Sequence, residues 1–147
     1  MRDALIATVI DEYATIEEFA SVLAVEQKAL TQMEPAEVLQ PIVEKKTELA
    51  RKLAQLEKIR DVQLAEMGFP AGRSGIELAA GRDPKLAAQW SLLQSSVVRA
   101  RRFNKTNGVL IRTRMEYTQR ALDVLQVRPP KPSLYGPDGR VPGFLSL

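Results

Sequence analysis

One long stretch of this chain contains neither glycine nor proline, and mostly apolar residues recur along it every three or four positions. This pattern limits the possible folds more than any other feature of the sequence. Residues 2–34 form this stretch. Its seam, the row expected to face a neighbouring helix, is Ile6, Val9, Tyr13, Ile16, Ala20, Leu23, Gln27 and Leu30. Alternating spacings of three and four are typical of a heptad repeat. They predict one long helix that packs along its whole length.

A second helix is predicted for residues 36–67. Pro35 and Pro41 lie near its start, where proline is tolerated because the first N–H groups of a helix have no intrahelical acceptor. Its seam is Leu39, Ile42, Leu49, Leu53, Leu56 and Ile59. Lys46 occupies a seam position where an apolar residue is expected, so we predict that it lies near a helix end or a groove.

The rest of the chain divides into a glycine-containing segment, a third helix and a tail. Residues 68–84 hold four glycines and two prolines, which predicts a loop with at most one helical turn over residues 76–80. A third helix is predicted over residues 84–127, with Asp83 as its N-cap. Five of the nine prolines fall in the last twenty residues, which predicts an extended, mobile tail.

These patterns predict an all-α fold. Residues 1–127 are expected to form an elongated, antiparallel three-helix bundle or coiled coil, followed by a Pro/Gly-rich tail over residues 128–147. A length of 147 residues fits one domain. Because the third helix is longer than the first, one of its ends is expected to project beyond the bundle. If the second and third helices start from a common end, the projecting part is the C-terminal one, around residues 117–127.

The composition excludes several classes of function. The chain has no cysteine and no histidine, which rules out disulfides, zinc sites built on those residues, and thiolate or imidazole catalysis. A carboxylate or lysine enzyme is the minor alternative, and its groups would be recognised only by their geometry. We predict a protein that is not an enzyme and uses no cofactor or metal. No stretch approaches the roughly 18 consecutive apolar residues of a membrane span, and no secretory leader is recognisable, so a cytoplasmic location is expected.

Charge is distributed unevenly along the chain. Residues 1–37 hold two basic and eight acidic residues, whereas residues 99–127 hold seven basic and two acidic ones. In a bundle, the acidic first helix can lie beside the basic third helix, and this cross-helix pairing is the commoner role of such runs. The alternative is nucleic-acid binding by Arg99, Arg101, Arg102 and Lys105, although no recognised DNA or RNA module accompanies them.

The third helix carries apolar residues over nearly half its circumference, which is more than one helix contact requires. One row is Ile111, Met115, Leu122 and Leu125, and the next is Leu110, Tyr117, Ala121 and Val124. The two rows can form a surface for a partner helix, the interior of the bundle, or the interface of a homodimer. The expected overhang favours a binding surface.

Two asparagines and a glycine interrupt this apolar pattern. Asn104 and Asn107 lie on the predicted seam, where they can fix helix register through hydrogen bonds or contact a ligand, and register is the better-attested role. Gly108 follows directly and can mark a close helix approach or a bend. In the tail, Tyr135 lies among turn residues, either docked on the bundle or offered as a short anchor to another protein.

The order of two short motifs resembles a known family. NKTNGVLI (residues 104–111) lies two-thirds of the way along the third helix, LYGPDG (residues 134–139) follows a proline-rich stretch, and EKK (residues 44–46) lies in the second helix. Together they resemble the FlgN family of flagellar type III export chaperones, over nearly the whole chain. VPGFLSL (residues 141–147) matches no signature of that family.

The resemblance implies a cytoplasmic, non-catalytic chaperone that binds hook-filament junction proteins through its C-terminal helical region and delivers them to the export gate. The implied cargo-binding residues are Leu110, Ile111, Met115, Tyr117, Thr118, Ala121, Leu122, Val124 and Leu125. Docking on the cytoplasmic domain of the gate membrane protein is implied for Leu134, Tyr135, Gly136, Asp138 and Gly139. A structural coiled-coil adaptor that self-associates through the same apolar rows is the other alternative.

Overall fold

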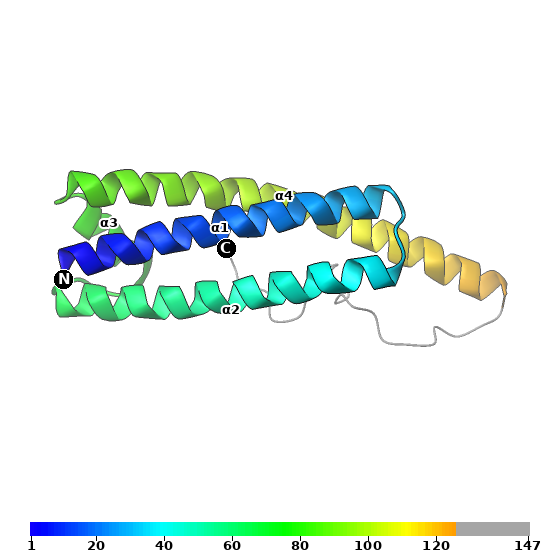
Figure 1. The fold of residues 1–147 in the computed structure, drawn as a ribbon, viewed down its shortest axis with the longest axis horizontal. Coiled ribbons are helices and arrows are strands. Elements are labelled where there is room, and N and C mark those ends of the chain that lie inside the picture. The colour runs from blue at the N-terminus through cyan, green and yellow to red at the C-terminus, as the bar shows by residue number, and fades with distance from the viewer. Residues whose placement is uncertain (126–147) are drawn as a thin grey trace.

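The computed structural model describes residues 1–125, which form four helices and no strand. They are α1 (Arg2–Thr31), α2 (Ala36–Glu66), α3 (Gly72–Ala80) and α4 (Pro84–Val124). Helix α1 runs antiparallel to α2 and parallel to α4, and it packs against both (Figure 1). The all-α class is thus confirmed for the described residues, with a fourth helix that the sequence did not predict. The expected tail, residues 128–147, lies outside them.

The prediction of a loop with at most one helical turn between residues 68 and 84 is wrong, because α3 occupies nine of these residues. Gly75 is typical of a loop, yet it is buried inside the helix. A Cβ atom there would lie 1.6 Å from the carbonyl oxygen of Pro70, so glycine is required by a close backbone approach. Ile76 and Ala79 anchor α3 in the main core.

The core follows α1 because this helix contacts neighbours on two sides. The larger cluster joins residues from all four helices, including Leu5 and Phe19, which lie off the predicted seam. A single seam describes one helix contact, whereas α1 needs a wider buried arc. A smaller cluster at the other end of the bundle consists of Ala29, Leu30, Leu39, Val43 and Ile111.

Both α1 and α4 begin at the same end of the molecule. Asp83 is the N-cap of α4, as predicted, and accepts hydrogen bonds from the backbone N–H groups of Lys85 (3.0 Å) and Leu86 (3.4 Å). Its carboxylate also pairs with Arg2, and this hydrogen bond lowers the pKa of Asp83. Because α4 has 41 residues and α1 has 30, α4 is longer by roughly 16 Å at 1.5 Å per residue.

Candidate functional site

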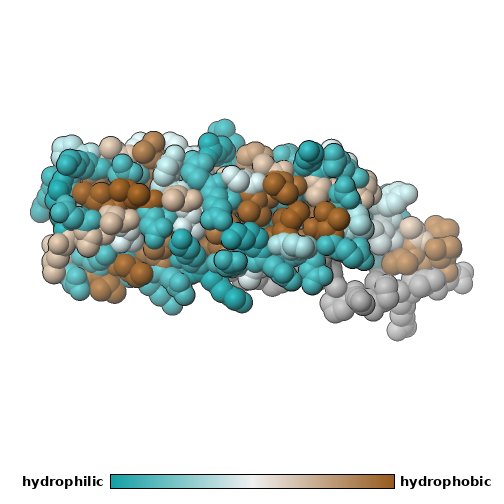
Figure 2. Space-filling model, in the orientation of Figure 1, coloured by the Kyte–Doolittle hydropathy of each residue, from teal (hydrophilic) through white to brown (hydrophobic). Residues whose placement is uncertain are grey.

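The candidate partner-binding surface is the C-terminal end of α4. This segment projects past the turn between α1 and α2 (Figure 1). Tyr117, Val124 and Leu125 are 65%, 83% and 69% exposed. Figure 2 shows hydrophobic side chains gathered at the projecting tip. Exposed apolar side chains concentrated at one place are typical of a protein-binding surface.

The structure divides the predicted cargo-binding residues into two groups. Ile111 is buried in the smaller core cluster, and Leu110 and Met115 pack against it, so these three belong to the bundle. Tyr117, Thr118, Ala121, Val124 and Leu125 are exposed on the projecting segment, and Leu122 is half-buried there. Only the second group is accessible to a partner without rearrangement of the bundle.

A buried polar layer lies immediately before the projecting segment. The side-chain N–H of Asn107 donates to the carbonyl of Leu23 (2.8 Å) and to Glu26 Oε1 (2.9 Å). Lys46 Nζ donates to both oxygens of Glu26, at 3.1 and 3.0 Å. Asn107, Glu26 and Lys46 are all buried, so one layer ties α4, α1 and α2 together.

Lys46 belongs to this buried layer and is only 2% exposed. The expectation that it lies near a helix end or a groove is therefore wrong. Burial lowers its pKa, while the neighbouring Glu26 carboxylate opposes that shift. A buried ammonium is tolerated here because a carboxylate faces it directly. Of the other motif residues, Gly108 is buried beside Asn107 and Asn104 is half-buried.

The acidic residues of α1 form ion pairs mainly with basic residues of α2. The ion pairs between these helices are Asp11–Lys52 (3.6 Å), Glu12–Arg60 (2.6 Å), Glu18–Lys45 (3.2 Å) and Glu26–Lys46 (3.0 Å). Within the described residues, α4 supplies one such partner, Arg99, which pairs with Glu17. The expectation that the basic third helix balances the acidic first helix therefore holds for Arg99, while α2 provides most of the pairing.

Several predicted features lie elsewhere. Leu134, Tyr135, Gly136, Asp138 and Gly139 fall outside the described residues. Within residues 1–125, no group of three or more acidic side chains is arranged to hold a metal ion. None of the helices in that part of the chain is long and apolar enough to cross a membrane.

Comparison with models of protein families shows which family this chain is related to. A family model described as FlgN protein matches residues 1–143. The chain belongs to the FlgN family. FlgN proteins are flagellar export chaperones, which gives this chain a general role in binding flagellar export substrates. No curated protein and no solved structure matches the chain.

Proposed function

We propose that this FlgN protein acts in the cytoplasm, binds hook-filament junction proteins through the projecting end of α4, prevents their premature association and delivers them to the type III export gate. The observation that carries the proposal is the exposure of Tyr117, Val124 and Leu125 on a helix end that projects beyond α1 and α2. In a family of export chaperones, such a surface suits cargo that presents an amphipathic helix.

The energetics of this surface fit reversible binding. Burying a side chain such as Val124 or Leu125 contributes about 1.5 to 3 kcal/mol. Association costs several kcal/mol in lost translational and rotational freedom, so a few anchors of this size give moderate affinity. A chaperone must release its cargo at the gate, and moderate affinity allows that release.

The bundle supports the rigid presentation of this surface. Ile111 is held in the smaller core cluster, and Asn107 is bonded to α1 one helical turn earlier. The projecting segment therefore continues a helix whose base is fixed on two sides. A preorganised helix loses little conformational entropy on binding, which favours cargo affinity.

Delivery to the gate is assigned to the tail motif. LYGPDG (residues 134–139) contains Tyr135 beside turn-forming Gly136, Asp138 and Gly139. Resemblance to the FlgN family supports docking of this motif on the cytoplasmic domain of the gate membrane protein. Because the motif lies outside residues 117–125, the cargo and gate contacts use different parts of the chain.

The test is calorimetric titration of the chain with C-terminal segments of the hook-filament junction proteins from the same organism. We expect saturable one-to-one binding that is weakened at least tenfold by Val124→Glu or Leu125→Glu, with unchanged helicity. Val62→Glu is the matched control, because Val62 is 58% exposed on α2. Binding to duplex DNA alone, or equal affinity in all variants, would overturn the proposal.

A further inference from the structure

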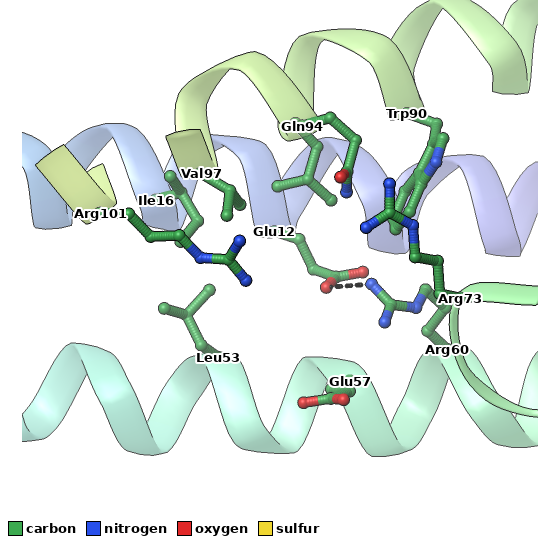
Figure 3. Close-up of a pocket in the computed structure, with 11 residues that line it drawn as sticks. Glu12, Ile16, Leu53, Glu57, Arg60, Arg73, Trp90, Gln94, Val97 and Arg101 are labelled. Carbon is green, nitrogen blue, oxygen red and sulfur yellow. Dashed lines mark hydrogen bonds and ion pairs between the residues drawn. The ribbon is translucent and has the colours of Figure 1, made fainter. Parts of the chain in front are cut away.

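A small pocket lies between α2 and α4, over the face of α1, next to the start of α3. No Cα atoms of α2 and α4 approach within 8 Å, and side chains line the gap between the two helices. Its volume is about 200 Å³. Its floor includes Glu12, and its walls include Arg60, Trp90 and Gln94 (Figure 3). The pocket belongs to the half of the bundle opposite the projecting end of α4, so it is separate from the proposed cargo surface.

Two buried polar atoms in this pocket have unused hydrogen-bonding capacity. Glu12 is only 5% exposed; its Oε2 accepts from Arg60 Nη1 at 2.6 Å, while its Oε1 has no hydrogen-bond partner within the described chain. The Nε of Arg60 is likewise buried without an acceptor. Such atoms are rare in folded proteins, because each lost hydrogen bond is costly. Both atoms belong to residues that line the pocket.

Guanidinium groups dominate the charge around the pocket. Arg73 of α3 and Arg101 of α4 lie on opposite sides of the Glu12 carboxylate (Figure 3). Arg73 forms an exposed pair with Glu77 at 2.8 Å, whereas Arg101 has no acidic partner among residues 1–125. The lining contains three arginines against two glutamates, Glu12 and Glu57. The lining therefore carries a net positive charge even when both glutamates are ionised.

The size of the pocket limits what it can hold. Typical small-molecule and cofactor sites have volumes of about 300 to 1,000 Å³. A space of about 200 Å³ fits one side chain or a small inorganic ion instead. Arginine binds oxyanions especially well because its planar fork donates two parallel hydrogen bonds.

We propose that this pocket binds a small oxyanion, carried by an acidic side chain of a protein partner or by free phosphate, with Arg101 and Arg73 as charge partners and Arg60 Nε as a further donor. Glu12 assists when protonated, because its free oxygen then donates a hydrogen bond to the anion. When ionised, the same oxygen repels it. Binding should therefore strengthen as the pH falls.

The groups that face Glu12 define this pH dependence. Burial raises the pKa of Glu12 to about 7; Arg60 opposes the shift, and Glu57 and Asp61 add to it. All three lie on α2, and the facing charges on the other elements are Arg73 of α3 and Arg101 of α4. Because the transition lies near neutral pH, the comparison between pH 6 and pH 8 brackets it.

Trp90 provides a direct readout, because it lines the pocket and is the only tryptophan of the chain. The full chain is titrated at pH 6 and at constant ionic strength, while its fluorescence is followed. One arm uses inorganic phosphate and another a capped Gly-Glu-Gly peptide, with capped Gly-Gln-Gly and Gly-Lys-Gly peptides as controls. We expect a saturable change with phosphate or with the glutamate peptide, and the responding arm identifies the source of the oxyanion.

Variants connect the response to the pocket. Arg101→Gln should weaken binding by about tenfold, the usual effect of removing one charge-assisted hydrogen bond. Arg102→Gln is the matched control, because Arg102 is exposed on the same helix and does not line the pocket. With the glutamate peptide, whose carboxylate is ionised at both pH values, Glu12→Gln should keep at pH 8 the affinity that the wild type has at pH 6. Absence of saturation with both anions, an equal response to the lysine peptide, or unchanged affinity in Arg101→Gln would overturn the proposal.

Discussion

Replacement of Glu12 by glutamine should change how the stability of the bundle depends on pH. Burial, opposed by the charge of Arg60, raises the pKa of Glu12 from 4.5 to about 7. Between these values the folded state keeps a proton that the unfolded state has lost, so folding stability falls as pH rises. Each pH unit in this range lowers the free energy of unfolding by about 1.4 kcal/mol. The stabilisation that protonated Glu12 gives to the folded state is complete below pH 4.5. About 3 kcal/mol of it is lost by pH 7 to 8.

Glu12→Gln isolates this contribution. Glutamine has nearly the same shape and does not ionise, so the variant lacks the penalty of a buried negative charge. We expect its free energy of unfolding, relative to the wild type, to rise by about 3 kcal/mol between pH 4.5 and pH 8 and then to level off. Only the change with pH is diagnostic, because the side-chain amide also alters the hydrogen bond to Arg60.

The assay is urea denaturation of both proteins, followed by circular dichroism at 222 nm from pH 4.5 to pH 8.5. Glu66→Gln, at an exposed position on the same helix as Arg60, serves as the reference for loss of one surface charge. A difference that does not vary with pH would show that burial does not raise the pKa of Glu12. A difference that declines as pH rises would show that the ion pair with Arg60 outweighs the cost of burial.

Three further predictions concern other parts of the chain. Lys46→Ala removes the ammonium that faces the buried Glu26 side chain, so it should lower the free energy of unfolding, measured by urea denaturation, by about 3 to 5 kcal/mol. A loss below about 1 kcal/mol would contradict this. Gly75→Ala should lower the thermal midpoint, because its Cβ would collide with the Pro70 carbonyl; an unchanged midpoint would show that α3 shifts freely. Tyr135→Ala should spare cargo affinity but weaken binding to the gate domain in calorimetry, and equal gate affinity would remove the role proposed for LYGPDG.

The long helices could be predicted from the sequence because their signals are local. Apolar spacing, proline at helix starts and the Asp83 cap each act within one or two helical turns. Thus the sequence predicts helices at about residues 2–34, 36–67 and 84–127, and the structure has Arg2–Thr31, Ala36–Glu66 and Pro84–Val124. The greater length of the third helix also predicts an overhang. The assumed common start of the second and third helices is wrong, because α2 and α4 begin at opposite ends; the overhang is C-terminal because α1 and α4 begin at the same end (Figure 1).

Helix α3 could not be predicted in the same way. Glycine is a poor helix former because it loses the most conformational freedom, and residues 68–84 contain four of them. The close approach of Pro70 overrides that preference at Gly75, where no other residue fits. Burial of Ile76 and Ala79 then stabilises a helix that local propensity disfavours.

The spacing of apolar residues predicts part of the buried face of α1, and it contains a signal for two charged residues on that face. Glu12 lies between Val9 and Ile16, and Glu26 between Leu23 and Leu30, at the same spacings of three and four. The partners of these two glutamates depend on how the separate helices pack. Arg60 is 48 residues from Glu12, and Asn107 is 81 residues from Glu26. Periodicity reports which side of a helix faces inward, but it holds no information about which distant side chain meets that side, because the packing of separate helices brings them together.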